Sequence, residues 1–527
     1  MAIINQYDKR SGKTYVYDSK SFREKGAKHP KSVRTLIGRL NMQTGEIEPT
    51  DGRGKKQKPT LINEVPAECT SRKYYGATYL FDEIGKKLGI DKDLKACFPE
   101  TYDQILSIAY FLALEDNSPL YRFGKWDILH KHPFGENIPS QRSSELFASI
   151  TEDNKNKFLQ LFAKRHAEKE HWYYDTTSIS SYSETLYQVQ YGKNKEGDKI
   201  PQFNLGLIFG RTSGLPFYYR KYSGNIPDVS TIEQLLYDFE ALGFRDVNVT
   251  IDRGGYSEEN INHLIKNGVK FLIATKTKLK YVEKEIQNVY DNITDFKYYH
   301  VQYELHSTTV KIKWEYTNPT GKSKKTSNKP AYLHIYFNPE KATEEKKSFY
   351  RKLEDMRNEI LSNERKSSNE EAYKKYFLTK KTPKRGIKVT IKENAVEEAT
   401  RYYGYFAFLS NIKIDSIAAL ELYRTKDIIE KAFGNLKDRL NLRCTLVSSE
   451  QSLNGKLFVA YIGLIYLSYI KQCMQETELF KKYTIPTLLD KLDVIECFEY
   501  QNRPIKYGEI TEKQQNLFKC MGVSPPM

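Results

Sequence analysis

Residues 247–256 read VNVTIDRGGY and join a short hydrophobic strand to an acid and a pair of glycines. The strand ends at Asp252, and Arg253, Gly254 and Gly255 follow it. Glycines at this point permit a tight turn and a close approach of the backbone to a phosphate group. Because α/β folds bind ligands at the carboxyl ends of their sheet strands, Asp252 is a candidate site residue.

Strands and helices alternate on both sides of this stretch. The hydrophobic pattern predicts strands at 171–175, 203–209 and 216–220, followed by a helix at 232–242. After the stretch come a helix at 256–267 and a strand at 270–274. Three strands followed by helix–strand–helix–strand predict an α/β fold with a mixed sheet.

Asp175 ends the first of these strands, as Asp252 ends a later one. Thr176, Thr177 and Ser178 follow it and could hold its carboxylate by hydrogen bonds. An acid at a strand end is also a common turn or capping residue, and that alternative stays open for either Asp alone.

The rest of the chain predicts a sequence of further parts. Residues 1–58 form a small β unit with a basic linker, and 59–170 form a helical, DNA-end-binding region, for which a simply packed helical subdomain is the alternative. The α/β core is 171–275 and 411–475. A β-rich insertion domain at 276–410 interrupts it, and 476–527 is a C-terminal helical region.

Charge favours a polyanionic partner. The 527 residues include 83 Lys+Arg against 67 Asp+Glu, a net charge of +16. Nucleic acid is the first candidate, with basic blocks at 52–58, 266–284 and 380–388, although lysine-rich surfaces are often only solvated. The apolar run 457–470 is too short to span a bilayer and predicts a buried helix. With no apolar leader, we expect a cytoplasmic protein that meets no membrane.

A third carboxylate lies in the stretch 422–440. At about 100° per residue, one helix face there is apolar. It consists of Leu422, Ile429, Phe433, Leu436 and Leu440. A second stripe less than a right angle away is polar and suits the wall of a cleft, with Tyr423, Lys426, Glu430 and Lys437. The alternative is a solvated face with a Lys426–Glu430 pair.

These residues resemble a known family. Tyr423-x₂-Lys426-x₃-Glu430-x₆-Lys437 is similar to the Y-R-E-K signature of DDE transposases in the IS-four group of bacterial insertion sequences. The residues around Asp175 and Asp252 resemble the family's first and second Asp motifs, and the order Asp, Asp, β-rich insertion, Glu is also the family's. Further similarities are Gly224-Asn225 with Asp228, and Gly455 with the apolar helix after it. One residue departs from the pattern, because the family usually has Arg where this chain has Lys426.

The resemblance implies an RNase H-like core and a DNA transposase that cleaves element ends and joins the 3′-OH ends to target DNA. Asp175, Asp252 and Glu430 would be catalytic and would bind two Mg²⁺ ions, with Mn²⁺ as a possible substitute. Tyr423, Lys426, Lys437 and Arg253 would bind DNA. The implied partners are double-stranded DNA and a second copy in a homodimer, in a bacterial, nucleoid-associated setting, with no small-molecule substrate. Trp314 could stack on a flipped base, although a core position is the preferred interpretation.

Three other hypotheses compete with an active transposase. One is a catalytically silent DNA-binding derivative, for which Lys426 leaves room. Another is an RNase H-like nuclease without strand transfer. The most distant is a carbohydrate-active enzyme with paired acids, against which the charge and the Asp–Asp–Glu order argue.

Overall fold

The computed structural model describes residues 2–22, 31–50, 69–166, 170–195, 197, 199–244, 246–319, 326–382, 386–440, 442, 444, 445, 447, 449–500 and 503–527. The chain divides into two units, Met1–Cys69 and Thr70–Met527. The predicted basic linker, residues 51–58, lies outside the described residues.

The first unit is an antiparallel sheet. Its strands are β1 (Ala2–Asp8), β2 (Lys13–Phe22), β3 (Lys31–Leu40) and β4 (Ile47–Glu48), in that order. β3 and β4 form a hairpin, with Gly45 at a φ of +72° in its turn. Among the described residues of this unit, Val16 is its one fully buried apolar side chain.

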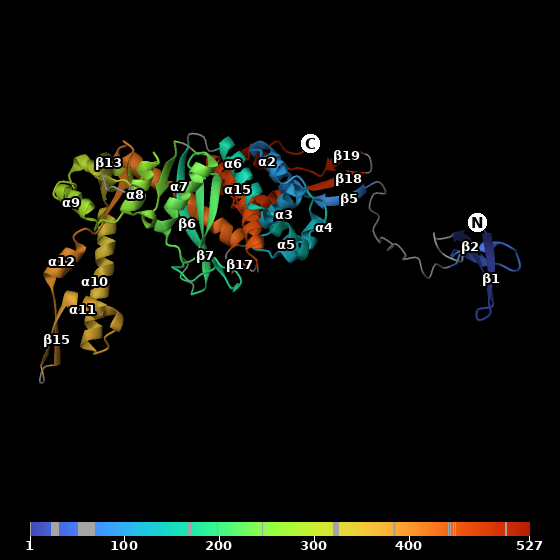
Figure 1. The fold of residues 1–527 in the computed structure, drawn as a ribbon, viewed down its shortest axis with the longest axis horizontal. Coiled ribbons are helices and arrows are strands. Elements are labelled where there is room, and N and C mark those ends of the chain that lie inside the picture. Colours follow the sequence, from blue (N-terminus) through green and yellow to red (C-terminus); the bar gives the residue numbers. More distant parts are fainter. Residues whose placement is uncertain are drawn as a thin grey trace. The chain divides into compact units, whose positions relative to one another are not determined.

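A large mixed sheet forms the centre of the second unit (Figure 1). Its antiparallel part consists of β6 (His171–Ser181), β7 (Gln202–Gly210) and β8 (Pro216–Ser223). Two parallel strands, β9 (Asn248–Ile251) and β10 (Lys270–Thr275), continue from β6. The helices α7 (Thr231–Leu242) and α8 (Glu258–Lys266) connect β8 to β9 and β9 to β10. The predicted mixed α/β fold is therefore confirmed.

The sheet continues beyond β10. Its order runs β11-β12-β13-β16-β10, with β11 (Tyr299–His300), β12 (Leu305–Thr317), β13 (Thr326–Phe337) and β16 (Tyr405–Ser410). The long strands β12 and β13 of the 276–410 segment thus extend the core sheet. Helices α9 (Lys280–Val289), α10 (Pro339–Leu361), α11 (Glu370–Tyr376) and α12 (Glu393–Thr400) give this segment about as much helix as strand.

Helices from both ends of the chain pack together. The N-terminal set is α1 (Gly76–Leu88), α2 (Ile90–Cys97), α3 (Tyr102–Leu114), α4 (Phe123–Leu129), α5 (Ser140–Ser149) and α6 (Glu152–His166). Helices α5 and α6 are separate, because the Thr151 hydroxyl accepts a hydrogen bond from the Asn154 amide and starts α6. The C-terminal set is α15 (Glu450–Glu476), α16 (Ile485–Asp493) and α17 (Glu512–Cys520).

The C-terminal part also contains strands that were not predicted. β18 (Glu496–Tyr500) and β19 (Arg503–Tyr507) form a small sheet with β5 (Cys69–Tyr74). The two ends of the second unit are therefore joined by a sheet as well as by helix packing.

Helix α15 is the centre of this packing. It contacts α3 and α5, and its Tyr461 hydroxyl donates to the Pro216 carbonyl at 2.8 Å. Among the described residues it is the one helix long and apolar enough to cross a membrane, and 83% of its most apolar window is buried inside the protein. The run 457–470 is thus a buried helix, as predicted.

Candidate active site

The pairing register of the parallel strands brings the two predicted aspartates together. Tyr174 of β6 is opposite Ile251 of β9, and this is their last pair. Asp175 and Asp252 are the next residues on these two neighbouring strands. Asp175 does not end its strand as predicted, because β6 continues to Ser181 through pairing with β7. Asp175 instead lies where the parallel pairing of β6 with β9 ends.

The glycines after Asp252 are required by close packing. Arg253–Gly255 form a 3₁₀ turn. A Cβ at Gly255 would lie 2.6 Å from the Ile251 side chain, and one at Gly254 would lie 3.0 Å from Asp228 Oδ2. The pair therefore lets the turn lie against the strand end and against Asp228.

The third carboxylate comes from a broken helical segment. The predicted continuous helix over 422–440 is α13 (Ser416–Arg424), then α14 (Asp427–Gly434), then a π-helical turn over Asn435–Arg439. The predicted apolar stripe is confirmed, since all five of its residues are buried. Glu430 lies on α14 with its side chain 63% exposed.

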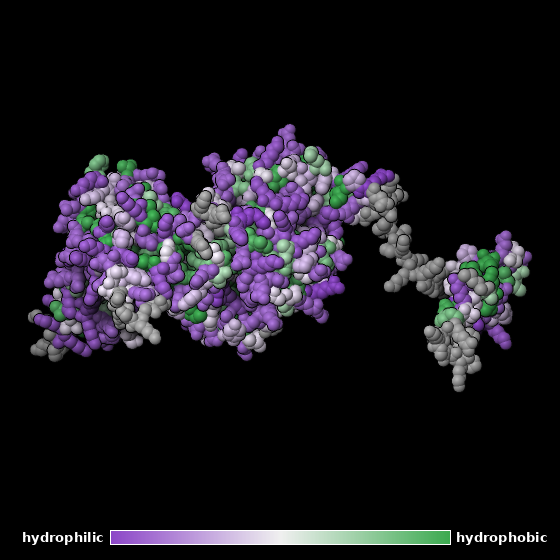
Figure 2. All heavy atoms as spheres, turned by 45° about the horizontal axis from the view of Figure 1, so that its top comes forward, coloured by the Kyte–Doolittle hydropathy of each residue, from purple (hydrophilic) through white to green (hydrophobic). Residues whose placement is uncertain are grey.

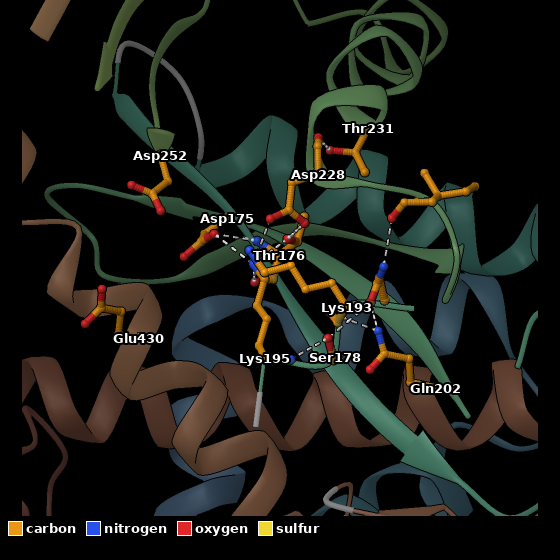
Figure 3. Close-up of polar contacts among 12 residues, drawn as sticks. Asp175, Thr176, Ser178, Lys193, Lys195, Gln202, Asp228, Thr231, Asp252 and Glu430 are labelled. Atoms are coloured by element: carbon orange, nitrogen blue, oxygen red, sulfur yellow. Dashed lines mark hydrogen bonds and ion pairs between the residues drawn. The ribbon is translucent and has the colours of Figure 1, made fainter. Parts of the chain in front are cut away.

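Asp175, Asp252 and Glu430 point toward one another from three separate elements (Figure 3). The Lys426 ammonium lies between them. Its Nζ is 3.7 Å from Asp175 Oδ2, 3.3 Å from Asp252 Oδ1 and 3.8 Å from Glu430 Oε1. The Lys426 side chain is only 9% exposed, so this ammonium faces the carboxylates rather than solvent.

Tyr423 holds Asp252 from the same helical segment. Its hydroxyl donates to Asp252 Oδ1 at 2.6 Å, and its ring stacks on Phe408 at a centroid distance of 4.3 Å. Burial opposes ionisation of Asp252, but Lys426 and the Tyr423 hydroxyl outweigh it and hold the pKa of Asp252 below its usual value. Burial and the Asp252 charge raise the pKa of Tyr423.

A second lysine lies on the other side of Asp175. Lys195 Nζ is 3.7 Å from Asp175 Oδ1 and 3.2 Å from Asp228 Oδ2, and it donates to the Thr176 carbonyl oxygen at 2.5 Å. The Thr176 hydroxyl donates to Asp228 Oδ1 at 2.5 Å, and its amide donates to Asp175 Oδ1 at 2.8 Å. Burial raises the pKa of Asp175, and the two lysines act in the opposite direction.

A cleft of 1020 Å³ opens over these groups. The predicted DNA-binding residues Arg253, Lys426 and Lys437 line it, and Lys193, Lys195 and Lys276 add further positive charge. The prediction included Lys276 in the basic block 266–284 but missed Lys193 and Lys195. Lys193 and Lys195 lie in the connection between β6 and β7, where the two lysines themselves were the one sequence feature that could have indicated a DNA-binding site.

Trp314 and His171 are core residues. Trp314 is 7% exposed, and its indole Nε1 donates to Asn262 Oδ1 at 3.0 Å. His171 bonds to Thr250 Oγ1 at 2.8 Å through Nε2, and burial lowers its pKa to about 4. The core interpretation of Trp314 is therefore confirmed.

The donor set suits a hard divalent cation, because three carboxylates converge on one positive charge. In the part of the chain that the structure describes, no three Asp, Glu, His or Cys side chains stand close enough to hold a metal directly. The Lys426 ammonium lies within 4 Å of each of the three carboxylates.

Comparison with known proteins identifies the family. Residues 166–463, more than half of the chain, match the model of the transposase DDE domain. The chain belongs to this family. As a DDE-family transposase, it has DNA as its partner and strand cutting and joining as its general activity, and the family generally uses divalent metal ions.

A solved structure is also similar to this transposase. It is the cryo-EM structure of a piggyBac transposase synaptic complex with hairpin DNA, at a TM-score of 0.37 and 10% sequence identity. The similarity covers 74% of this chain and 70% of that one. No curated protein gives a significant match to the chain.

Proposed function

We propose that this chain is a transposase of the IS-four group of bacterial insertion sequences, which binds the ends of its element, cleaves them and joins the 3′-OH ends to target DNA. The convergence of Asp175, Asp252 and Glu430 in a basic cleft carries the proposal. The Tyr423–Lys426–Glu430–Lys437 spacing supports the IS-four assignment.

The strand order supports an RNase H-like core. Three antiparallel strands are followed by two parallel ones, with helices between. The core comprises 171–275 and 411–475, and 276–410 is the insertion between the two Asp motifs and the Glu. Residues 59–170 bind the element's ends, with 1–58 and 476–527 as the terminal regions. The protein acts in the bacterial cytoplasm, on the nucleoid, as a homodimer that brings two ends together.

Asp175, Asp252 and Glu430 would hold two Mg²⁺ ions, or Mn²⁺ in their place. When bound, such ions lower the pKa of a water and stabilise charge on attacking and leaving oxygens. Tyr423 orients Asp252 through its hydrogen bond, and Lys195 steadies Asp175 from the opposite side. Arg253 and Lys437 bind the phosphates of the terminal strand, and Lys426 joins them when the carboxylates are neutralised by another cation.

The reaction is two successive transfers at phosphorus. Water oxygen bonds to the phosphorus at the element's end and loses a proton. The bond to the 3′ oxygen breaks and this oxygen gains a proton, so the terminal nucleotide keeps a 3′-OH and the flanking strand keeps a 5′-phosphate. That hydroxyl then loses its proton and bonds to a phosphorus of the target strand, and a target 3′ oxygen leaves and is protonated. Charge develops on phosphate oxygens in both steps, and the lysines and Arg253 around the cleft are positioned to face it.

Cleavage of a labelled duplex that carries the element's own end tests this function. Wild type should nick it with Mg²⁺ and not with EDTA. Glu430→Gln, Asp175→Asn and Asp252→Asn should each bind the duplex normally and lose on the order of 10³-fold in nicking, since each removes part of a several-kcal/mol contribution. Wild-type nicking by any of them would remove that residue from the site, and absence of joined products would leave a nuclease.

A silent DNA-binding derivative is the second candidate. The observation that favours it is the Lys426 ammonium, which pairs with all three carboxylates and stands where the family usually has Arg. Binding of correct ends without nicking would favour this candidate. Lys426→Arg would then be the first variant to test for restored cleavage.

A further inference from the structure

A limb leaves the sheet between β13 and β16, beyond the catalytic cleft. It consists of α10, α11, α12 and a two-stranded ribbon, β14 (Phe377–Thr382) and β15 (Gly386–Ile391). The limb has a hydrophobic core of its own, formed by Leu353, Met356, Ile360, Tyr373, Phe377 and Val396. Figure 1 shows α11 and β15 at the end of α10 that lies away from β13. The ribbon is therefore packed on the limb and not on the core sheet.

Positive charge is concentrated at the ribbon. Residues 374–392 read KKYFLTKKTPKRGIKVTIK, with eight Lys or Arg and no Asp or Glu. Helix α10 of the same limb carries six basic and six acidic residues. In Figure 2 hydrophilic side chains cover the lower left of the molecule, where α10 lies. The face of the limb seen in this view is mostly hydrophilic, but only the segment around the ribbon has a strong charge of one sign.

The strand register places two lysines side by side. Phe377 pairs with Ile391, so Lys380 pairs with Lys388. Ile387, Val389 and Ile391 are half-buried against the limb core, and Lys388 and Thr390 are exposed on the other face. Within the described residues neither Lys380 nor Lys388 has an acidic partner. Like charges directly opposite in a sheet are destabilising, so this face suits a polyanion.

A groove leads from the catalytic cleft to α11, the helix that precedes the ribbon. It has a volume of 580 Å³, and Arg253 lines both the groove and the cleft. The groove extends past Lys278, Lys341 and Arg401 to Lys375 in α11, the helix that leads into the ribbon. Three acids, Glu283, Glu345 and Glu398, also line it, so its five cations are in excess. A strand bound at the carboxylates has a basic path toward the ribbon.

We propose that the outer face of β14–β15 is a second DNA-binding surface, which contacts the phosphates of duplex DNA outside the catalytic cleft. A two-stranded ribbon has the width that the major groove of DNA admits, and lysines contact phosphates without reading sequence. The inference rests on the proposed function, because it assigns the DNA of that reaction to this surface. The ribbon adds affinity and takes no part in cleavage.

Salt dependence of DNA binding tests the surface. The full chain is compared with Lys380→Gln/Lys388→Gln, and with Lys346→Gln/Lys347→Gln as a control that removes the same charge from exposed positions on α10. A labelled duplex of arbitrary sequence is titrated at several salt concentrations. Loss of two phosphate contacts should make the slope of log K against log salt shallower by about 1.8, with weaker binding at low salt. The control should keep the wild-type slope.

Cleavage measured on the same proteins separates this inference from the proposed function. At saturating DNA the ribbon variant should nick at the wild-type rate, and its Tm should be no lower than that of wild type, because the opposed lysines destabilise the ribbon. Lys388→Glu alone should weaken binding more than Lys388→Gln. An unchanged salt slope in the ribbon variant would overturn the proposal that the ribbon binds DNA, even if wild type cleaves normally. A decrease in slope of the same size in the control variant would overturn it as well. A wild type that binds no DNA would overturn both proposals.

Discussion

The ammonium of Lys426 lies 3.3 Å from Asp252 Oδ1, and the same Nζ is within 4 Å of Asp175 and Glu430. One lysine is thus the shared counter-ion of three carboxylates that belong to three elements of the fold. A divalent cation that binds these carboxylates must compete with this ammonium, which gives Lys426 a measurable effect on metal affinity.

Lys426→Met should therefore bind Mn²⁺ more tightly than wild type, because the carboxylates lose their internal counter-charge. Without metal the variant should have an unfolding free energy lower than that of wild type by on the order of 1–2 kcal/mol. This is less than the loss for breaking a fully buried ion pair, because the Glu430 side chain is 63% exposed. The rise in Tm with added Mn²⁺ measures both effects. Lys276→Met is the matched control, because Lys276 lines the cleft and no ion pair to the three carboxylates is found for it in the described structure. An equal Mn²⁺ response in wild type and Lys426→Met would contradict the competition.

Asp228→Asn should slow nicking on the order of 10-fold with little change in DNA affinity. The amide keeps an oxygen acceptor for Thr176 but loses the charge that holds Lys195 against Asp175. Lys195→Met should slow the same step, and the double variant should add little, because both changes break one unit. Lys199→Met, an exposed lysine of the same connection that does not line the cleft, is the control. Additive losses would show that Asp228 and Lys195 act independently.

The sequence pointed to the two aspartates as candidates because each closes a short hydrophobic run, and the parallel register of β6 and β9 makes them neighbours. It did not identify the length of β6, since residues 176–181 are mostly small and polar and are held in the strand by pairing with β7. That pairing is a tertiary effect with no signal in the local pattern.

The position of Lys426 was also beyond the sequence. A continuous helix over 422–440 places Lys426 on the cleft wall, beside Glu430. The structure interrupts the helix at Thr425, whose hydroxyl donates to the Glu421 carbonyl at 2.8 Å, and Lys426 lies in the turn with its ammonium among the carboxylates. Lys195 was missed for a different reason, because a lysine in a long connection carries no periodicity that marks it.

Gly455→Ala should destabilise the fold. A Cβ at Gly455 would lie 2.0 Å from the Phe147 carbonyl oxygen, so α15 and α5 would have to separate. A cost of about 1–3 kcal/mol is expected for such overpacking, seen as a lower Tm. Gly434→Ala in α14 is the matched control, since a Cβ there meets no atom within 4 Å and alanine favours a helix by up to about 1 kcal/mol. A Tm for Gly455→Ala at or above that of wild type would show that the helices do not cross this closely.

His130 makes stability depend on pH where α4 meets α16. Its Nε2 lies 2.8 Å from Asp493 Oδ2, and its side chain is 6% exposed. Burial alone would lower the pKa of His130, but the bond to Asp493 outweighs it and the pKa is raised, with Glu115 acting in the same direction. Burial lowers the pKa of the neighbouring His132. The dependence of the wild-type unfolding free energy on pH therefore contains two opposing contributions.

A comparison with His130→Gln isolates the first of them. A histidine whose pKa is raised in the folded protein contributes its full stabilisation below its pKa in the unfolded chain, about 6.5. That contribution disappears as the pH rises through its pKa in the folded protein. Wild type should therefore exceed His130→Gln in unfolding free energy by more at about pH 5.5 than at about pH 8.5. Denaturant titrations at the two pH values measure the difference. Asp493→Asn removes the same partner and should give the same trend, whereas a gap that widens as pH rises would mean that His130 is neutral in the folded protein.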